Sequence, residues 1–273
     1  MLLQCGKFQL DLALPVVMGI VNVTPDSFSD GGQHLTSHAA LQHAHNLIKQ
    51  GADILDLGGE STRPGALTIS VQEELDRVMP VIEGLQGAPI PLSIDTCKPE
   101  VMNAALKAGV SMVNDTTALQ HTESLACAIK HQITVCLMHS QGTPQTMQQA
   151  PHYDDVVTEV KQFLQDRVSS VSAAGISLQR IVIDPGFGFG KTFEHNLALL
   201  RHLANLTDLG VPVLVGLSRK SMLGKITGQD INHRIHASVA AALLAVQRGA
   251  NIVRVHDVQA TKDALKVWKA VAA

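Results

Sequence analysis

Apolar residues follow two different spacings along this chain, and the two spacings alternate from one end to the other. Short β-branched runs are typical of strands buried on both faces of a sheet. Between them lie longer segments in which apolar residues recur every three or four positions, as on one face of a helix. In residues 38–50, for example, Leu41, Ala44 and Leu47 share a face, and Gly51 ends the pattern. The spacing predicts strands at 16–21, 54–57, 91–94, 112–113, 134–138, 181–183, 213–217 and 252–255, and helices at 38–50, 99–108, 154–174, 234–248 and 261–271.

These segments form eight successive strand-then-helix units, and eight units in roughly 250 residues are typical of a (β/α)8 TIM barrel. A doubly wound parallel sheet is the alternative, because it also alternates strands with helices. The even spacing of the units favours the barrel, and no linker or low-complexity segment divides the chain. We therefore expect a single domain over residues 1–273, in which residues 1–14 form two short strands that cover the base of the barrel.

Composition narrows the functional class. A net charge of −3 and an aromatic content of 3% argue against a nucleic-acid-binding surface, which needs clustered basic residues and stacking rings. The four cysteines are scattered without a C-x-x-C pair, which favours free thiols in a reducing compartment over disulfides or zinc. No apolar run approaches the length of about 18 residues that a membrane helix needs. We expect a cytoplasmic protein with neither a membrane nor a nucleic-acid partner.

Polar side chains follow each of the eight expected strands. In a barrel the C-terminal ends of the strands meet on one face, and active sites lie there. A single polar residue at a strand end is usually a helix cap or a turn former. Eight such strand ends in succession instead predict a functional face. The residues concerned are Asn22, 58–63, Asp95, Asn114 with Asp115, His139, Asp184, 218–220, and Arg254 with His256.

Three of these residues, Asp95, Asn114 and Asp184, are short planar groups at the ends of apolar strands. Buried carboxylates are costly unless donors satisfy them. A flat heterocycle with adjacent N–H and NH2 groups would supply such donors. The alternative is that the carboxylates cap the following helices, which suits Asp95 better than Asp184.

The last two expected strands end in a group of cations, Arg219, Lys220, Arg254 and His256. Many barrels bind phosphate at this place. Arg254 and His256 are two positions apart, so they lie on the same side of an extended chain and can share an anion. The alternative is a solvated ion pair at the rim.

The stretch DPGFGFGKT at 184–192 misses a phosphate-binding loop by one residue, because Pro185 stands where G-x-x-x-x-G-K-[ST] needs its first glycine. Proline removes an N–H that a phosphate cradle would use. We expect instead a glycine loop whose Phe187 and Phe189 offer a flat slot for a ring or pack beneath the loop. The polar loops at 22–32 and 58–65 are expected to act as lids or to be ordinary surface turns.

Eight motifs run in order over nearly the whole chain: GIVNVTPDSFSDGG (19–32), DLGGESTRPGA (56–66), SIDTCKPEV (93–101), VND (113–115), LMH (137–139), IDPGFGFGKTFEHNL (183–197), GLSRKSMLG (216–224) and IVRVHDV (252–258). Together they resemble the motifs of dihydropteroate synthases, enzymes of the folate pathway. The resemblance implies a TIM barrel, usually a homodimer. Such an enzyme joins 4-aminobenzoate to the (7,8-dihydropterin-6-yl)methyl group of a diphosphate ester and releases diphosphate with the help of Mg2+. One departure is Ser140, where the family usually has methionine.

The resemblance also implies roles for individual residues. The pterin site would contain Thr62, Asp95, Asn114, Asp184 and Lys220, of which Asp95, Asp184 and Lys220 would be catalytic. The diphosphate site would contain Asn22, Arg254 and His256, and Asn22 would also hold Mg2+. The 4-aminobenzoate slot, where sulfonamides compete in this family, would contain Arg63, Pro64, Phe189 and Ser218 and be closed by the loop that holds Phe28.

The expected mechanism needs no side-chain nucleophile. Loss of diphosphate leaves a cation conjugated with the dihydropterin, and carboxylates in a dry site would stabilise it until the aryl amine attacks. We therefore interpret Cys97 as a small buried thiol, and His139 as either a base or a core residue. The alternatives are a pterin-dependent corrinoid methyltransferase domain, against which the RVH pair and the lysine of SRKS argue, and a non-catalytic pterin-binding paralogue, against which the intact slot residues argue.

Overall fold

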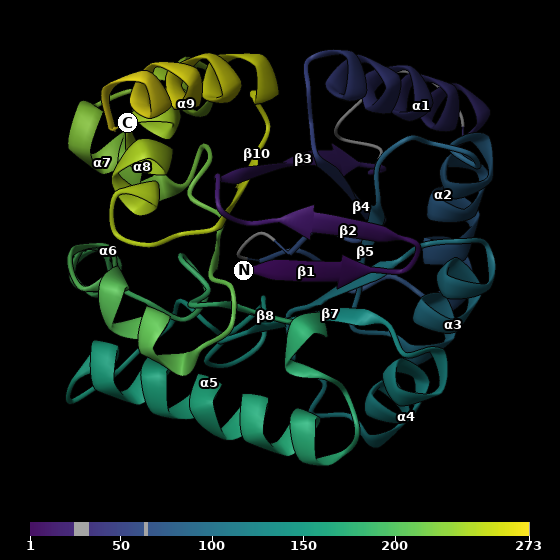
Figure 1. The fold of residues 1–273 in the computed structure, drawn as a ribbon, viewed down its shortest axis with the longest axis horizontal. Helices are drawn as coiled ribbons and strands as arrows, with labels where there is room; N and C mark the ends of the chain where they lie inside the picture. The colour runs from purple at the N-terminus through teal and green to yellow at the C-terminus, as the bar shows by residue number, and fades with distance from the viewer. Residues whose placement is uncertain (25–32, 63–64, 273) are drawn as a thin grey trace.

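The structure, a computed structural model, describes all residues except 25–32, 63–64 and 273. Eight parallel strands of the described chain form a ring in the order β8-β7-β6-β5-β4-β3-β10-β9 (Figure 1). A parallel bridge between Ile183 and Val213 joins β8 to the residue before β9 and closes the ring. The predicted barrel is confirmed, and the doubly wound sheet is wrong. The bounds are β3 Val16–Asn22, β4 Ile54–Gly58, β5 Leu92–Asp95, β6 Met112–Asp115, β7 Thr134–Met138, β8 Ile181–Asp184, β9 Leu214–Val215 and β10 Ile252–Val255.

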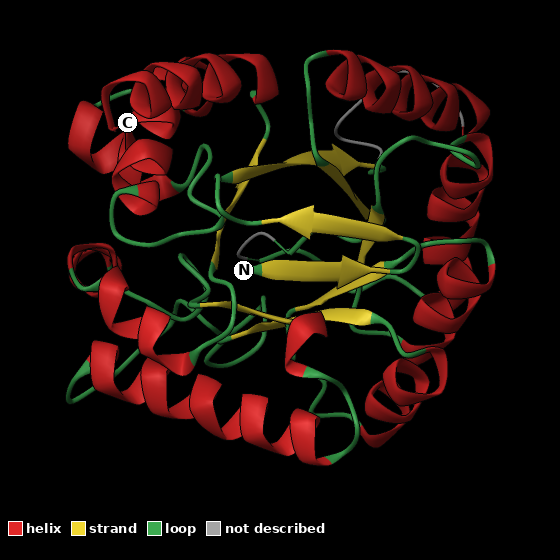
Figure 2. Cartoon of the chain, in the orientation of Figure 1, coloured by secondary structure: helices red, strands yellow, loops and turns green. Residues whose placement is uncertain are grey.

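Helices surround the ring of strands on the outside (Figure 2). Polar side chains begin several of them, because Ser70, Asp155 and Thr192 each accept a hydrogen bond from a backbone N–H of the first turn. Each helix expected from the spacing is present, although α1 and α9 begin earlier than expected. The bounds are α1 Gln33–Lys49, α2 Val71–Gly84, α3 Pro99–Lys107, α4 Thr122–His131, α5 Val156–Ala173, α6 Phe193–Arg201, α7 Ser221–Thr227, α8 Ile235–Val246 and α9 Val258–Ala272.

An antiparallel hairpin, β1 Leu2–Cys5 and β2 Phe8–Asp11, precedes the barrel and lies across its N-terminal end in Figure 1. Leu3, Cys5 and Leu12 are buried and pack with the apolar side chains inside the barrel. The hydroxyl of Thr134, the first residue of β7, donates a hydrogen bond to the carbonyl oxygen of Gln4. The hairpin therefore contributes to the core as well as covering its base.

Alternation along the strands decides which residues face the barrel interior, because successive side chains point to opposite faces. On β4, Ile54 joins the interior cluster, whereas Leu55 and Leu57 pack against the helices. Asp56 follows Ile54 by two positions and so faces the interior. A polar layer lies above the apolar one for this reason: Asn114, Asp184 and Arg254 likewise follow the inward residues Met112, Val182 and Ile252 by two positions.

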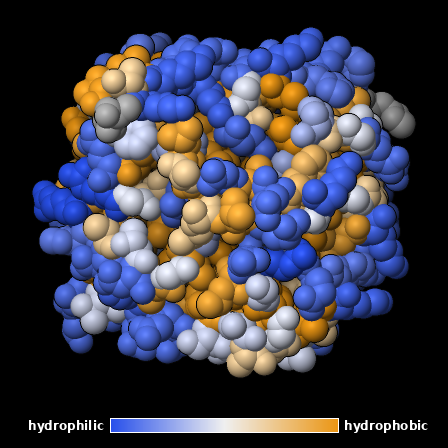
Figure 3. All heavy atoms as spheres, viewed as in Figure 1, coloured by the Kyte–Doolittle hydropathy of each residue, from blue (hydrophilic) through white to orange (hydrophobic). Residues whose placement is uncertain are grey.

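None of the described helices is both long and apolar enough to span a membrane. On the face that carries the hairpin, polar side chains form most of the periphery, with apolar side chains gathered between them (Figure 3). All four cysteines are free thiols, as predicted; Cys5 and Cys136 are buried as expected, whereas Cys97 and Cys127 are half-buried.

Candidate active site

The C-terminal face of the barrel brings an arginine between two carboxylates. Arg254 on β10 donates from Nε to Asp56 Oδ2 at 2.6 Å and from Nη2 to Asp95 Oδ2 at 2.7 Å. Burial alone would lower the pKa of Arg254, but the two carboxylates raise it, so the guanidinium stays charged. Burial raises the pKa of Asp95 to about 7; Arg254 opposes this shift, and Asp56, Glu74 and Asp115 add to it.

Asp56 is a site residue that the sequence reasoning missed. It is fully buried, and its Oδ2 also accepts a hydrogen bond from Asn114 Nδ2 at 3.1 Å. The sequence predicts site residues where polar side chains follow the strands, and Asp56 lies inside an apolar strand instead. The signal that could have found it is a lone charge two positions after an inward-facing isoleucine, on the strand's interior face.

Two oxygens of this cluster, Asp56 Oδ1 and Asn114 Oδ1, are buried and have no hydrogen-bond partner among the described residues. Buried acceptors without donors cost free energy. A ligand with N–H groups in this part of the barrel would satisfy them. The expectation that the carboxylates and Asn114 face a donor-bearing ring is therefore consistent with the geometry.

Asp184 and Lys220 lie beside this cluster. Asp184 is buried, and its Oδ1 accepts a hydrogen bond from Gly186 N at 2.7 Å within the loop, so it does not cap a helix. Burial raises the pKa of Asp184, and the hydrogen bond and the charge of Lys220 oppose the shift. Burial lowers the pKa of Lys220 to about 8, and its Nζ lies 4.4 Å from the centre of the Phe189 ring.

Three further predicted residues follow the last two strands of the barrel. Ser218 and His256 contact each other, whereas Arg219 forms an ion pair elsewhere. Ser218 Oγ lies 2.9 Å from His256 Nδ1 and accepts a hydrogen bond from His256 N. Arg219 does not join the cations, because it has a left-handed backbone with a φ of 59° and pairs with Asp257 at 2.7 Å. The interpretation of Arg219 as part of the anion site is wrong.

The loop DPGFGFGKT turns its lysine inward. Lys191 is only 3% exposed; its Nζ lies 2.9 Å from His139 Nδ1 and donates to the carbonyl oxygen of Phe189 at 2.9 Å. Gly190 permits the turn, since its φ is 62° and a Cβ there would collide with the carbonyl oxygen of Gln141. Burial lowers the pKa of Lys191 to about 7. The lysine of this near P-loop therefore braces the loop from inside and does not face a phosphate.

The structure also decides between the interpretations that the sequence left open for His139, Phe187 and Phe189. Burial lowers the pKa of His139 to about 3, and its ring packs edge-on against Phe163 with centres 4.9 Å apart, so it is a neutral core residue. Phe187 is buried beneath the loop, whereas Phe189 is half-buried beside Lys220. Cys97 was expected to be buried and is half-buried instead; burial still raises the pKa of its thiol to about 11, which favours the protonated form.

Asn22 and Thr62 complete the described part of the face. Asn22 ends β3 opposite Gly58, and both Asn22 and Thr62 are half-buried. Phe28, Arg63 and Pro64 lie outside the described residues.

A magnesium ion fits the donor chemistry of Asn22. No group of three or more His, Cys, Asp or Glu side chains in the described chain could hold a metal ion. Mg2+ prefers oxygen ligands, keeps several waters and is often held mainly by substrate phosphates. A single amide oxygen is therefore compatible with an ion that arrives with a diphosphate.

Comparison with known proteins identifies the family. The family of pterin binding enzymes matches residues 18–256. A curated dihydropteroate synthase from Neisseria meningitidis serogroup C is 52% identical, with 98% of this chain and 96% of its own length covered. A solved dihydropteroate synthase from Xanthomonas albilineans with 4-aminobenzoic acid has a TM-score of 0.94 and 54% identity, covering 100% of this chain and 98% of that one. The chain belongs to the dihydropteroate synthases.

A second structure supports the same assignment. The Xanthomonas albilineans dihydropteroate synthase in complex with 7,8-dihydropteroate has a TM-score of 0.92 and 52% identity, covering 100% of this chain and 99% of that one. The family match runs from β3 to β10, so it includes all eight strands of the barrel. The resemblance inferred from the motifs is confirmed. Dihydropteroate synthases are transferases, and the corrinoid methyltransferase alternative finds no support among these relatives.

Proposed function

We propose that this dihydropteroate synthase joins 4-aminobenzoate to (7,8-dihydropterin-6-yl)methyl diphosphate and yields 7,8-dihydropteroate and diphosphate. The relatives bound to 4-aminobenzoic acid and to 7,8-dihydropteroate support both halves of the reaction. The observation that carries the proposal is the buried cluster in which Asp56, Asp95 and Arg254 pair beside two unsatisfied acceptors. Such a cluster suits a ring rich in N–H donors.

The pterin occupies the polar layer at the strand ends. Asn114 and Asp184 offer acceptor oxygens from β6 and β8, and Asp95 offers a carboxylate from β5. Lys220 lies within Coulombic reach of both Asp184 and Asp95. Thr62, half-buried in the loop that follows β4, is assigned to this pocket by family resemblance.

The diphosphate lies toward Asn22, Arg254 and His256. A guanidinium has five N–H donors in a planar fork, so Arg254 can hold its two carboxylates and still donate to a phosphate. Asn22 would hold Mg2+ together with phosphate oxygens and water. When bound, this ion neutralises the charge of the leaving diphosphate.

4-Aminobenzoate binds between the loop of Phe189 and the end of β9. Phe189 is half-buried beside Lys220, and Ser218 is held by His256, so together they offer a flat surface and a polar edge. Arg63 and Pro64 from the second loop, and Phe28 from the first, belong to the same slot by family resemblance.

The chemistry follows from the charges of the site. The C–O bond to diphosphate breaks, and the leaving group takes both bonding electrons. Asp95 and Asp184, ionised, stabilise the positive charge that spreads into the dihydropterin. The amine of 4-aminobenzoate then forms the new C–N bond and loses one proton. Positioning and exclusion of water provide the remaining rate enhancement, and no covalent enzyme intermediate forms.

The protein forms a homodimer and works in the cytoplasm. The sequence of α8 is mostly apolar, apart from His236 and Ser238, and Leu244 on that helix is 42% exposed, which supports a surface that a second copy covers. The four free thiols support a reducing compartment. Light scattering coupled to gel filtration tests the dimer, and a monomer at micromolar concentration would contradict it.

The reaction itself is tested by diphosphate release from the pterin diphosphate with Mg2+, in the presence and absence of 4-aminobenzoate. We expect release that depends on 4-aminobenzoate and on Mg2+, with 7,8-dihydropteroate as product. Tight pterin binding without release or product would refute the synthase reaction and favour a non-catalytic paralogue.

A further inference from the structure

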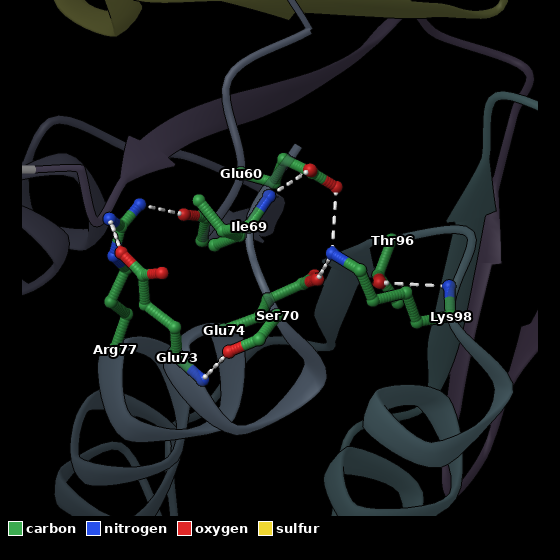
Figure 4. Close-up of polar contacts among 9 residues, drawn as sticks. Glu60, Ile69, Ser70, Glu73, Glu74, Arg77, Thr96 and Lys98 are labelled. Carbon is green, nitrogen blue, oxygen red and sulfur yellow. Dashed lines mark hydrogen bonds and ion pairs between the residues drawn. The ribbon is translucent and has the colours of Figure 1, made fainter. Parts of the chain in front are cut away.

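Two loops of the C-terminal face are held in different ways. Beyond β4, Glu60 is held by charge, because its Oε2 lies 2.9 Å from Lys98 Nζ, which in turn lies 2.6 Å from the buried Glu74 (Figure 4). Beyond β8, the segment of residues 186–190 is held mainly through its own carbonyl oxygens. A backbone carbonyl in a loop needs a donor from a side chain, from the backbone or from water. The position of this segment therefore depends on which groups donate to it.

Three consecutive carbonyl oxygens in this segment each accept a hydrogen bond from a side chain. The pairs are Gln148 Nε2 to Gly188 at 2.6 Å, Lys191 Nζ to Phe189 at 2.9 Å and Tyr153 Oη to Gly190 at 2.8 Å. Lys191 belongs to the same loop as its acceptor. Gln148 and Tyr153 belong to the β7–α5 loop, residues 139–155, and lie 40 and 37 positions before their acceptors. Two loops that are distant in sequence are thus joined at the segment that carries Phe189.

The β7–α5 loop is itself held in one shape. Gln141 closes its neck, since its Nε2 donates to His152 O at 3.2 Å and its Oε1 accepts from His152 N at 3.3 Å. Within the loop, Met147 is only 4% exposed, and its N–H donates to the carbonyl oxygen of Thr143 at 2.7 Å. Gln148 follows directly after this buried residue. It therefore starts from an anchored point, although it is itself exposed.

Tyr153 is held by its surroundings as well. It is the only tyrosine of the chain and is buried. Its ring packs edge-on against the ring of His195 on α6, with centres 5.0 Å apart. The hydrogen bond from its hydroxyl to Gly190 is buried, and a buried carbonyl that loses its donor costs free energy. Removing the hydroxyl alone should therefore loosen the segment without disturbing the packing of the ring.

The segment in turn supports two side chains of the proposed site. The centre of the Phe189 ring lies 4.4 Å from Lys220 Nζ. Gly188 lies beside the stem of the same lysine, because a Cβ at Gly188 would already be in van der Waals contact with Lys220 Cδ at 3.4 Å. Movement of the backbone at residues 188–190 would therefore shift the Phe189 ring and uncover Lys220.

We propose that Gln148 and Tyr153 are positioning residues for the synthase reaction, and that they act through the backbone of residues 188–190 on Phe189 and Lys220. The inference rests on the proposed function, because Phe189 is assigned there to the 4-aminobenzoate slot and Lys220 to the pterin site. Binding of both substrates depends on the two residues, since one segment supports both side chains.

The kinetic test compares Tyr153→Phe and Gln148→Ala with Gln149→Ala. Gln149 is the next residue along the same loop, it is exposed, and its side chain makes no hydrogen bond within the described chain. We expect each of the first two variants to raise KM for 4-aminobenzoate about fivefold, as the loss of one hydrogen bond would. Both should also raise KM for the pterin diphosphate. Gln149→Ala should behave as the unmodified protein.

The pH profile of kcat/KM distinguishes positioning from a general loss of stability. Lys220 faces Asp184, Asp95, Arg254 and Lys191. Burial lowers the pKa of Lys220 to about 8; Arg254 adds to this shift, and the two carboxylates oppose it. When the segment loosens, water reaches Lys220 and its pKa rises, so the fall in kcat/KM moves from about pH 8 to higher pH. The rise that follows the ionisation of Asp95 should stay in place.

Two kinetic results would overturn the proposal. The first is an unchanged KM for 4-aminobenzoate in both Tyr153→Phe and Gln148→Ala. The second is a fall in kcat/KM at the same pH in these variants as in the unmodified protein, because Lys220 would then not depend on the segment.

Hydrogen exchange separates this inference from the proposed function. Amides within residues 186–190 should exchange faster in Tyr153→Phe and Gln148→Ala than in Gln149→Ala without any substrate present. If the unmodified protein formed no 7,8-dihydropteroate, the proposed function would be wrong, and this difference would still report whether the β7–α5 loop holds the segment. Equal exchange in all three variants would refute the positioning role whatever the activity.

Discussion

Replacing Asp56 by Asn should weaken both the fold and the reaction. Asp56 Oδ2 accepts from Arg254 at 2.6 Å and from Asn114 at 3.1 Å, and the side chain is fully buried. An asparagine keeps one acceptor oxygen of similar shape but removes the charge that Arg254 needs. Hydrogen bonds to charged groups contribute about 1.5 to 3 kcal/mol. Arg254 retains Asp95 as a partner, so we expect a loss of about 2 kcal/mol in the free energy of unfolding.

The same change should lower kcat/KM by about tenfold to a hundredfold, because each 1.4 kcal/mol of lost positioning corresponds to about a factor of ten. Urea unfolding followed by circular dichroism measures the first effect, and steady-state product formation measures the second. Asp53→Asn is the matched control, since Asp53 pairs with Lys262 at 2.6 Å while one third of its side chain is exposed. A partly exposed pair of this kind contributes about 1 kcal/mol or less, and the control should leave the kinetics unchanged.

The result that would refute this reasoning is an Asp56→Asn variant with unmodified stability and unmodified kcat/KM. It would mean that Asp95 alone fixes Arg254 and that the buried charge on β4 has no role. Equal losses of stability in Asp56→Asn and Asp53→Asn would also contradict the argument from burial.

Three further predictions concern the same face. Asp184→Asn should lose most activity while its circular dichroism spectrum and unfolding midpoint stay near those of the unmodified protein; turnover at the unmodified rate would contradict the role of its charge. The value of kcat/KM should rise with pH through about 7, because burial raises the pKa of Asp95 and this carboxyl becomes ionised there. It should fall above about pH 8, because burial lowers the pKa of Lys220 and the ammonium group loses its proton there. A flat profile between about pH 6 and 9 would exclude both assignments. Lys191→Met should raise KM for 4-aminobenzoate about fivefold, the equivalent of about 1 kcal/mol, because the carbonyl of Phe189 loses its donor; an unchanged KM would show that the loop keeps its shape without the lysine.

The sequence predicted the barrel because the strands are buried on both faces and therefore read as apolar runs. It predicted Asp95, Asn114 and Asp184 because each lies at the end of such a run. Asp56 was not predicted because it lies within an apolar strand. Its position two residues after Ile54 nevertheless implies that its side chain faces the barrel interior.

Side-chain direction outside the strands was harder to predict. Arg219 itself has a positive φ, and it pairs with Asp257 instead of joining the other cations. Lys191 turns inward and contacts His139, which directly follows β7 and lies 52 positions earlier in the sequence. Contacts between residues so distant in sequence leave no trace in local spacing. The roles of Thr62, Asn22, Phe189, Ser218 and His256 toward particular ligands stay predictions.

The place where the ring of strands closes has a consequence for how ligands act on the fold. β9 has two residues, and in the described chain it meets β8 through the bridge between Ile183 and Val213. The least stable regions of a protein are those with few such backbone links, so thermal opening of the barrel should start at this seam. Asp184 stands on one side of the seam, and Ser218 and Lys220 stand on the other. A ligand that contacts both sides therefore links them where the sheet has few hydrogen bonds. Because such a ligand binds only the closed barrel, its binding raises the free energy of opening the barrel.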